Sequence, residues 1–283
     1  MRTVRTVREL RAAVAARREL GPVGLVPTMG AFHEGHLSLM RHAREDCATV
    51  VVSLFVNPAQ FGPSEDLGAY PHDEERDAAL AAELGMDILF APSLDEVYPP
   101  GFDTSVAVLG ATEVLCGDPQ RRGPAHFTGV TTVVTKLFNM VGPDVAYFGQ
   151  KDAQQAIVIR KLVRDLDLPV RIAVLPTVRE RDGLAMSSRN AYLNGEERKR
   201  ALALSRALSA ADAAVAAGRR DASDVLEAAR RELESRGVVP EYLELRSADD
   251  LSAAERVNGR TLLAVAARVG RARLIDNAVL GDE

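Results

Sequence analysis

Short apolar runs alternate with amphipathic stretches along roughly the first 180 residues of the chain. Residues 23–27 read VGLVP and residues 49–56 read TVVVSLFV. Such continuous runs are typical of strands that are buried on both faces of a parallel sheet. Between them, Leu37, Met40 and Ala43 recur at the spacing of one helical face. The pattern therefore predicts alternating strands and helices, as in a doubly wound α/β domain.

The same pattern predicts the order of the elements. We expect a helix (1–20), a strand (23–27), a helix (33–46), a strand (49–56), a loop (59–69), a helix opened by Pro71 (71–84), a strand (86–90), a loop (93–103), an extra strand (104–109), a basic loop (117–126), a helix (127–141), a strand (145–148), a helix (149–166) and a strand (170–178). The predicted fold is Rossmann-like, and in such parallel sheets ligands bind beyond the carboxyl ends of the strands.

The composition changes past Asp182. Residues 195–218 and 221–236 are rich in Ala, Arg and Glu and are expected to be helices. Three short strands are expected to follow, at residues 242–246, 262–267 and 273–277. The sequence therefore predicts a second, smaller α/β domain, with residues 1–178 in the first domain and 179–283 in the second.

The stretch after the first predicted strand combines a tight loop, two histidines and a helix N-terminus. Residues 28–30 interrupt the apolar run, and His33 and His36 lie where the helix begins. Unpaired N–H groups and the positive end of the helix dipole converge at such a point and bind phosphate. The imidazoles can add hydrogen bonds, while Gly30 and Gly35 allow a ligand to approach the backbone closely.

Other interpretations fit these histidines less well. A lone histidine is more often a surface or capping residue, but two of them flanked by glycines favour a binding site. The zinc-protease motif needs two histidines four residues apart, whereas this chain has H-E-G-H. The spacing of Gly30 and Gly35 resembles the start of a P-loop, but His36-Leu37 stands where Lys-Ser/Thr is required, and no G-x-G-x-x-G occurs. If these residues bind a nucleotide, they do so without a P-loop or a G-x-G-x-x-G motif.

A second strand-to-helix junction carries a cation. Lys151 lies in GQKD (149–152), at the start of a predicted helix, where the helix dipole disfavours a positive charge. The position therefore favours an anionic ligand. A solvated lysine paired with Asp152 is the simpler alternative.

Residues 184–190, LAMSSRN, lie near the predicted junction of the two domains. They offer two hydroxyls and an arginine whose planar fork suits phosphate. An N-cap followed by a surface arginine is the simpler alternative. Taken together, Arg189, Lys151, His33 and His36 predict a convergent polyphosphate site.

Two glutamines could serve a different purpose. The amides of Gln60 and Gln155 can donate to a carboxylate without neutralising it. A carboxylate that must attack phosphorus should be held in that way, because a buried arginine would stabilise the ground state. Each glutamine could equally be a surface residue.

Composition and charge narrow the class of protein. The chain has 283 residues, 47% of them hydrophobic, and a formal net charge of −5, which argues against a nucleic-acid partner. It contains no apolar run of membrane length and no signal peptide, and its Arg-rich start also carries Glu9 and Glu19. Its two cysteines suggest no disulfide framework, so we expect a cytoplasmic protein.

Four segments resemble the pantoate–β-alanine ligase family, the pantothenate synthetases. In chain order they are PTMGAFHEGH (27–36), SLFVNPAQFGPSEDLGAYP (53–71), HFTGVTTVVTKLFNMVGPDVAYFGQKDAQQ (126–155) and PTVRERDGLAMSSRNAYL (176–193). The likeness runs over nearly the whole chain. The HEGH and MSSR segments also resemble the paired signature motifs of the wider nucleotidyltransferase superfamily, which includes class I aminoacyl-tRNA synthetases.

The resemblance implies a two-step ligation. ATP and pantoate would give an enzyme-bound pantoyl adenylate and pyrophosphate, and the amine of β-alanine would then release pantothenate and AMP. It also implies a cytoplasmic homodimer that acts on small molecules, with no nucleic-acid or membrane partner. Residues 1–178 would bind the nucleotide and pantoate, and residues 179–283 would form a lid that closes over the nucleotide.

The resemblance also implies site residues. His36, His33, Lys151 and Arg189 would be catalytic, with Lys151, Ser187 and Arg189 on the ATP phosphates. ATP would be bound by Met29, Gly30, Ala31, Phe32, His33, Glu34, Gly35, His36, Gly149, Gln150, Lys151, Asp152, Val178, Met186, Ser187, Ser188 and Arg189. Gln60 would contact pantoate and β-alanine, and Gln155 would contact pantoate. Mg²⁺ is expected with ATP, and Asp77 is its expected helper.

The chain departs from the family pattern at two positions. Phe32 stands where leucine is common, an apolar exchange that should change packing only, and His72 stands where arginine is common. Two alternatives to the ligase stay open. A related nucleotidyltransferase would form no amide bond, and a nucleotide-binding regulator would release no pyrophosphate. A tRNA synthetase is disfavoured by the acidic charge and the lack of an anticodon-binding extension.

Overall fold

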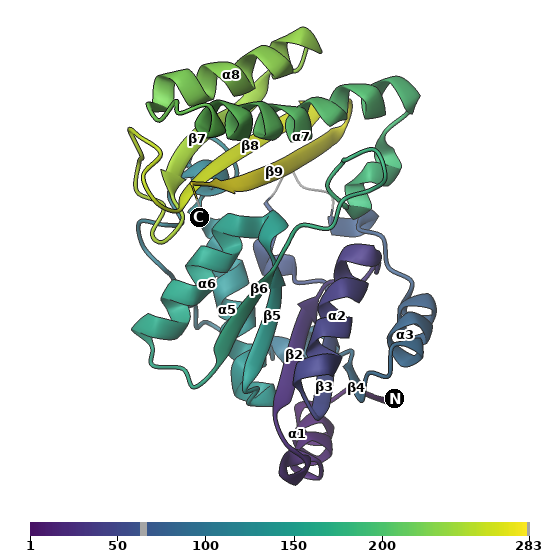
Figure 1. Ribbon diagram of the computed structural model, residues 1–283. Coiled ribbons are helices and arrows are strands. Elements are labelled where there is room, and N and C mark those ends of the chain that lie inside the picture. The colour runs from purple at the N-terminus through teal and green to yellow at the C-terminus, as the bar shows by residue number, and fades with distance from the viewer. Residues whose placement is uncertain (63–66, 282–283) are drawn as a thin grey trace. The chain divides into compact units, whose positions relative to one another are not determined.

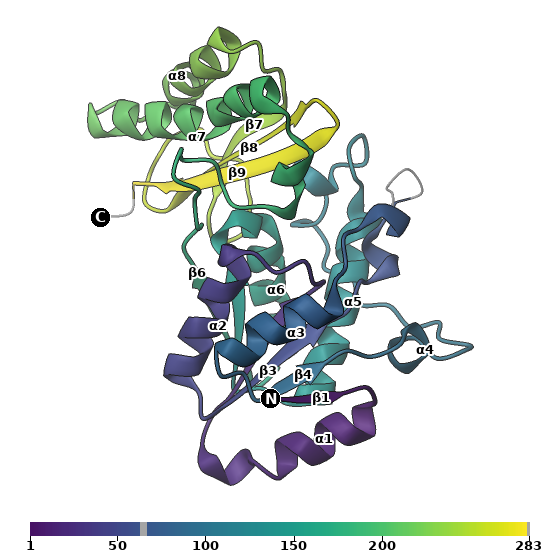
Figure 2. The ribbon, with the colours of Figure 1, turned by 90° about the vertical axis from the view of Figure 1, so that its right-hand side faces the viewer.

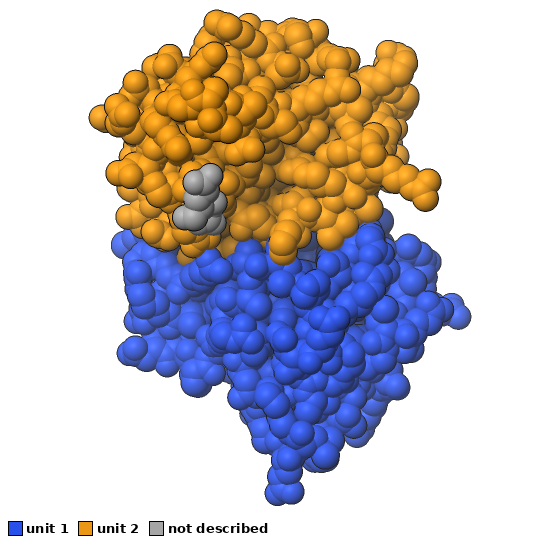
Figure 3. All heavy atoms as spheres, viewed as in Figure 1, with its two compact units in different colours: residues 1–149, 158–175 blue, residues 150–157, 176–283 orange. Residues whose placement is uncertain are grey.

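The computed structural model describes residues 1–62 and 67–281 and divides them into two compact units. Unit 1 contains residues 1–149 and 158–175, and unit 2 contains residues 150–157 and 176–283 (Figure 3). Each unit has a hydrophobic core of its own. The short segment 150–157 thus belongs with the C-terminal unit, although the chain reaches it from a strand of unit 1.

The described residues of unit 1 form a six-stranded parallel sheet (Figure 1). Its spatial order is β1 (Arg2–Val4), β4 (Ile88–Phe90), β3 (Thr49–Leu54), β2 (Val23–Thr28), β5 (Val145–Gly149) and β6 (Arg171–Leu175). Gly24 of β2 pairs with Val50 on one side and with Val145 on the other. The chain order reverses between β2 and β5, and this switch point is where doubly wound sheets bind ligands.

Helices cover both faces of this sheet (Figures 1 and 2). Helices α1 (Val7–Ala15) and α5 (Pro124–Val141) pack on one face with α6 (Ala153–Asp165), while α2 (Glu34–Asp46) and α3 (Glu74–Glu83) pack on the other. Successive residues of β3 alternate between the two cores, since Val51 joins the first and Val50 and Val52 join the second. Burial on both faces explains the continuous apolar runs.

The described part of unit 2 contains a three-stranded antiparallel sheet that is covered by two helices (Figure 1). The strands are β7 (Pro240–Ser247), β8 (Thr261–Val269) and β9 (Ala272–Leu280), and the helices are α7 (Gly195–Ala216) and α8 (Ala222–Ser235). Asn194 caps α7, and Leu204 and Leu208 of α7 lie in one core with Leu263 and Val265 of β8. The predicted fold class, a doubly wound parallel sheet followed by a smaller α/β domain, is confirmed.

Two predictions near the strands were wrong. The first residues form the edge strand β1, which pairs in parallel with β4, before helix α1 begins. Residues 104–109 form no strand. Their backbone bonds to helix α5 instead: the Val106 N–H donates to Thr132 Oγ1 at 2.9 Å, and the Thr131 hydroxyl donates to the Val106 carbonyl. These hydroxyls replace a neighbouring strand as hydrogen-bond partners.

Several helix boundaries also differ from the prediction. Helix α3 begins at Glu74, because Asp73 caps it by accepting a hydrogen bond from the Arg76 N–H at 3.0 Å. Helix α5 begins at Pro124, inside the predicted basic loop. The expected loop 93–103 contains the short helix α4 (Leu94–Val97), which Ser93 caps. Among the described residues, no helix combines the length and the apolar character needed to cross a membrane.

Candidate active site

The loop that follows β2 is held in a strained conformation by a buried carboxylate of unit 1. Gly30 and Ala31 have φ angles of +88° and +53°, and the second value is unusual for a residue with a side chain. Asp77 of helix α3, which is fully buried, accepts hydrogen bonds from the N–H groups of Ala31 at 2.7 Å and Phe32 at 2.8 Å. The carboxylate thus fixes the part of the loop that leads into the histidine pair.

Both histidines use Nδ1 as an acceptor at the start of α2. His33 is the N-cap: its Nδ1 accepts a hydrogen bond from the Gly35 N–H at 3.1 Å, and the His36 Nδ1 accepts one from the His33 N–H at 3.4 Å. The two rings are stacked with their centroids 4.2 Å apart. A neutral imidazole that accepts at Nδ1 carries its proton on Nε2, so each ring has an Nε2–H donor. His33 therefore is a capping residue, and in both rings the acceptor role of Nδ1 places the proton of a neutral imidazole on Nε2.

Glu34, between the two histidines, is directed away from this arrangement. Its carboxylate is exposed and accepts a hydrogen bond from Arg41 Nη1 at 2.6 Å. This bond with Arg41 holds the pKa of Glu34 below its ordinary value. Glu34 therefore carries a charge that is already paired within helix α2.

The amide of Gln60 is oriented by a buried asparagine that the sequence reasoning missed. Asn57, 1% exposed, donates from Nδ2 to Gln60 Oε1 at 3.0 Å, and Gln60 Nε2 lies 3.2 Å from Met29 Sδ. The Tyr98 hydroxyl donates to Asn57 Oδ1 at 2.8 Å. Because Gln60 Oε1 accepts from Asn57, the Nε2 group is the donor end of the amide, and one of its N–H groups is directed at Met29 Sδ. The signal in the sequence was Asn57-Pro58, an N-cap followed by proline.

Helix α5 approaches the Gln60 turn (Pro58–Gln60) unusually closely. A Cβ atom added to Gly129 would lie 2.2 Å from the Ala59 carbonyl oxygen, so only glycine fits there. Nearby, His126 Nδ1 donates to the Gln60 carbonyl at 2.7 Å, and Arg122 Nη1 donates to His126 Nε2 at 3.0 Å. No role for His126 or Arg122 was predicted from the sequence. His72, which stands where arginine is common in the family, is exposed, and its ring lies 2.9 Å from the Tyr70 carbonyl.

Three of the residues predicted to bind phosphate line one hollow within unit 2. They are Lys151, Ser187 and Arg189, which come from two distant parts of the sequence. Ser187 caps the short 3₁₀ turn Ser188–Tyr192 by accepting a hydrogen bond from the Arg189 N–H at 3.3 Å. The capping alternative is thus observed for Ser187, in a turn that brings Arg189 to the hollow. A hydroxyl, an ammonium and a guanidinium in one hollow suit an anionic ligand.

A small hairpin leads to this turn. The Met186 N–H donates to the Val178 carbonyl at 2.9 Å, so two predicted ATP contacts are paired through their backbones. Asn190 is buried against the hairpin and donates to the Ala185 carbonyl at 3.0 Å and to Glu180 at 2.6 Å. Its Oδ1 atom is buried and has no hydrogen-bond partner among the described residues, although the residue lines the hollow.

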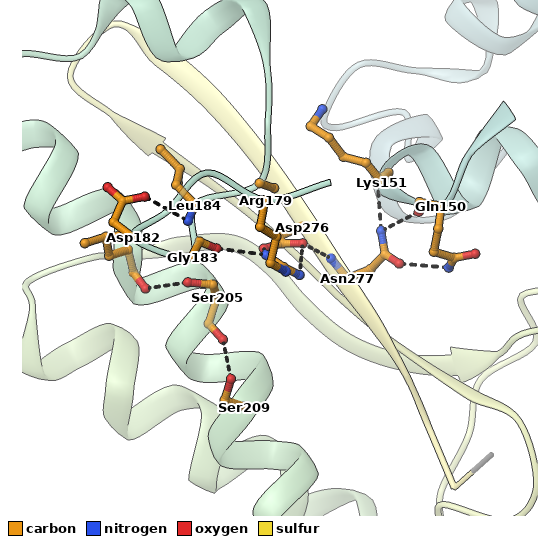
Figure 4. Close-up of polar contacts among 12 residues, drawn as sticks. Gln150, Lys151, Arg179, Asp182, Gly183, Leu184, Ser205, Ser209, Asp276 and Asn277 are labelled. Carbon is orange, nitrogen blue, oxygen red and sulfur yellow. Dashed lines mark hydrogen bonds and ion pairs between the residues drawn. The ribbon is translucent and has the colours of Figure 1, made fainter. Parts of the chain in front are cut away.

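Strand β9 supplies two polar residues that the sequence reasoning also missed (Figure 4). Asp276 Oδ2 accepts a hydrogen bond from Arg179 Nη1 at 2.7 Å, and its Oδ1 accepts one from Nη2 at 3.0 Å. Asn277 donates from Nδ2 to the carbonyls of Gln150 and Lys151, each at 2.9 Å. The signal in the sequence was a polar pair at the end of the strand predicted at residues 273–277, which lies in the middle of the observed strand β9.

The other predicted residues are placed as follows. Gly149 ends strand β5, and Gln150 to Asp152 form a 3₁₀ turn in which Asp152 is exposed. Gln155 and Ser188 are half-buried in unit 2, whereas Gln60 lies in unit 1. The assignment of these residues to substrates stays a prediction.

Asp77 does not suit direct contact with Mg²⁺. Its side chain is fully buried, and each carboxylate oxygen already accepts a backbone hydrogen bond. No group of three or more His, Cys, Asp or Glu side chains that could hold a metal ion is found within residues 1–62 and 67–281. Magnesium commonly binds through substrate phosphates and water with one or two carboxylates. The expected role of Asp77 therefore has no support in this geometry.

Comparison with known proteins points to one family. The family model for pantoate-beta-alanine ligase matches residues 2–279. Pantothenate synthetases of Moorella thermoacetica and Pelotomaculum thermopropionicum are 53% and 52% identical to this chain, over 99% and 98% of both chains respectively.

Solved structures of the same family are also similar to this chain. A pantothenate synthetase from Thermus thermophilus is 48% identical with a TM-score of 0.93, covering 98% of this chain and 99% of its own. A pantoate-beta-alanine ligase from Francisella tularensis, described as complexed with beta-gamma ATP and beta-alanine, is 32% identical with a TM-score of 0.80, covering 99% and 97%. With a family model that spans residues 2–279 and relatives matched over nearly their whole length, the chain belongs to the pantoate–β-alanine ligase family.

Proposed function

We propose that the chain performs the reaction of its family, the ATP-dependent ligation of pantoate to β-alanine, with the triphosphate bound by Lys151, Ser187 and Arg189. The observation that carries this assignment is the hollow of unit 2, which these three side chains line together. Cationic and hydroxyl donors that are fixed before the reaction stabilise charge where it develops in the transition state. The relative from Francisella tularensis, whose structure holds a nucleotide and β-alanine, supports ATP as the substrate.

The histidine pair forms the second part of the proposal. The Nε2–H groups of His33 and His36 would donate to phosphate oxygens, since Nδ1 of each ring accepts a backbone hydrogen bond. The loop residues 29–36 would follow the nucleotide, with Asp77 holding the loop from behind through Ala31 and Phe32. Val178 and Met186 would offer the nucleotide their hairpin backbone, beside Gly149 and the residues of the Lys151 turn.

In the first step the pantoate carboxylate attacks the α-phosphorus of ATP. A bond forms between a carboxylate oxygen and phosphorus, the bond to the bridging oxygen breaks, and pyrophosphate leaves with the electron pair. Negative charge grows on the α-phosphate and on the pyrophosphate, where the cationic side chains would stabilise it. Gln60 and Gln155 would hold pantoate through neutral amides, so that its carboxylate keeps its charge for the attack.

In the second step the neutral amine of β-alanine attacks the acyl carbon of the adenylate. A carbon–nitrogen bond forms, the carbon–oxygen bond to AMP breaks, and the amine loses a proton. Gln60 would contact β-alanine as well as pantoate, and holding the two reactants side by side accounts for much of the rate. No nucleophilic serine or cysteine is required.

We also propose that Mg²⁺ arrives with ATP and is held mainly by its phosphates. The ion would neutralise part of the phosphate charge. We further propose a homodimer in the cytoplasm, as expected from the family resemblance, with pantoate as a binding partner. We also propose that residues 1–178 bind the substrates and that residues 179–283 form a lid.

Product analysis tests the reaction against its two alternatives. The purified enzyme is incubated with ATP and pantoate, with and without β-alanine, and the products are identified by mass spectrometry. We expect pyrophosphate from ATP and pantoate, and pantothenate with AMP only when β-alanine is added. Formation of a dinucleotide-type product with no amide would favour the related nucleotidyltransferase, and failure to release pyrophosphate would favour a nucleotide-binding regulator.

A further inference from the structure

We propose that Asp276 and Asn277 of strand β9 are positioning residues for the two turns that carry Lys151 and Arg189. The inference rests on the proposed function, which places those two cations on the triphosphate. Asp276 and Asn277 are adjacent, buried and polar, at 3% and 6% exposure, in a strand whose other buried residues are mostly apolar. Both side chains form hydrogen bonds to residues outside the sheet.

Asn277 holds the Lys151 turn by three hydrogen bonds (Figure 4). Its Nδ2 group donates to the main-chain carbonyls of Gln150 and Lys151 at 2.9 Å each, and its Oδ1 accepts from Gln150 Nε2 at 2.9 Å. Both N–H groups of the amide are therefore engaged, and a flipped amide would place its oxygen against two carbonyl oxygens. Only a neutral amide fits, because a carboxylate would repel those carbonyls and an ammonium could not accept from Gln150.

Asp276 holds the hairpin that leads to Arg189. Its carboxylate binds the Arg179 guanidinium through two parallel hydrogen bonds and also accepts the Asn277 N–H at 2.8 Å. Arg179 in turn donates to the Gly183 carbonyl at 3.2 Å and pairs through its backbone with Ala185. The two ends of the hairpin are thereby fixed just before the turn that carries Ser187 and Arg189.

This arrangement explains why residues 150–157 belong to unit 2. The bonds of Asn277 join the Lys151 turn to strand β9, and Asp276, the next residue along the strand, joins the Arg189 hairpin to it. The turns that carry Lys151 and Arg189, which are distant in the sequence, are thus both held by hydrogen bonds to strand β9. Such preorganisation matters because a misplacement of about 1 Å at a reacting centre can reduce the rate by about 100-fold.

A double-mutant cycle tests the role of Asn277. The initial rate of pyrophosphate release from ATP and pantoate is measured for the wild type, Asn277→Ala, Lys151→Ala and the double variant. We expect Asn277→Ala to lower kcat/KM for ATP by about 10-fold or more, and to have little further effect once Lys151 is absent. Non-additivity of this kind indicates action through Lys151, whereas a merely structural loss would multiply with that of Lys151→Ala.

Thr261→Val is the matched control. Thr261 is a buried polar residue of the adjacent strand β8, and its hydroxyl donates to the Gly259 carbonyl at 3.4 Å. We expect this variant to keep wild-type kinetics. Asn277→Asp preserves the side-chain volume and serves in place of Asn277→Ala should the latter fail to fold by circular dichroism.

The outcomes separate the two proposals. Wild-type kinetics in Asn277→Ala, or a loss that multiplies fully with Lys151→Ala, overturns the positioning role while the proposed function stands. Wild-type kinetics in Lys151→Ala overturns the assignment of Lys151 itself. For Asp276, we expect Asp276→Asn to raise KM for ATP, because the amide keeps one acceptor for Arg179 and loses the charge; an unchanged KM contradicts its role.

Discussion

The buried carboxylate of Asp77 accepts a hydrogen bond of 2.7 Å from the main-chain N–H of Ala31, which has a φ of +53°. A second bond, from Phe32 at 2.8 Å, engages the other carboxylate oxygen. The backbone conformation of Ala31, which is unfavourable for a residue with a side chain, is thus stabilised by a carboxylate of helix α3. The two histidines begin two residues after Ala31. Asp77 therefore has a structural role in holding this loop.

Removing this carboxylate should weaken the fold. Asp77→Ala leaves the N–H groups of Ala31 and Phe32 without their acceptor, so we expect the free energy of unfolding to fall by about 3 kcal/mol, since hydrogen bonds to charged groups are the stronger class. Asp77→Asn keeps one acceptor and should lose roughly half as much. Urea denaturation measures both. A wild-type stability combined with a raised Mg²⁺ requirement would instead support a metal-binding role for Asp77.

The close approach at Gly129 leads to a second prediction. Gly129→Ala would place Cβ 2.2 Å from the Ala59 carbonyl oxygen, so helix α5 or the Gln60 turn must shift. We expect a loss of about 2–3 kcal/mol in stability, typical of overpacking, together with a raised KM for pantoate. Gly195→Ala is the matched control, because it lies at the start of helix α7 with no atom within 4 Å of the added Cβ. Equal stabilities of the two variants would contradict the close contact.

The strands of the first sheet were predictable because burial on both faces makes their apolar runs continuous, as in β2 and β3. The edge strand β1 was missed because its three residues, Arg-Thr-Val, carry only one buried side chain. Residues 104–109 were misassigned because an apolar run does not reveal that the hydroxyls of Thr131 and Thr132 serve its backbone. Local pattern shows burial; it does not show the hydrogen-bond partner.

Some residues of the candidate site could likewise be recognised in the sequence, and others could not. Lys151, Ser187 and Arg189 were proposed from the sequence because each stands at a turn with a recognisable chemistry, and the structure places all three on one hollow; their roles stay a prediction. The dipeptide Asn57-Pro58 had the pattern of a cap, but the bond from Asn57 to the Gly129 carbonyl could not be predicted, because the two residues are distant in the sequence. The same holds for the bond from Asn277 to the Lys151 carbonyl. No periodicity marks such tertiary contacts. The resemblance supplied Asp77, and its bonds to Ala31 and Phe32 then gave it a physical role.

Tyr98 should make stability depend on alkaline pH. Burial raises the pKa of Tyr98 from its ordinary value of 10 to about 12, and its hydroxyl donates to Asn57. Between these two values the unfolded phenol ionises while the folded one keeps its proton, so the folded state binds more protons and stability falls as the pH rises. Below pH 10 the contribution is fully present.

A difference measurement isolates this effect from the other groups that titrate in alkali. The free energy of unfolding of the wild type minus that of Tyr98→Phe should be constant below pH 10 and should decrease from pH 10 to pH 12. Urea denaturation at several pH values gives the difference. A difference that does not change with pH would show that the phenol ionises alike in both states.

His36 provides the most direct test of the catalytic assignment, because its helix offers a second histidine as a control. In His36→Ala the proposed Nε2–H donor is lost from the start of α2, and we expect the rate of pyrophosphate release to fall by about 100-fold or more, as when one donor to a developing charge is removed. His42 lies on the exposed side of the same helix, where its ring contacts the Ser38 carbonyl at 2.9 Å. His42→Ala should keep wild-type turnover, and circular dichroism should show both variants folded. Wild-type turnover in His36→Ala would remove this histidine from the reaction and leave the triphosphate to the lysine and arginine of unit 2.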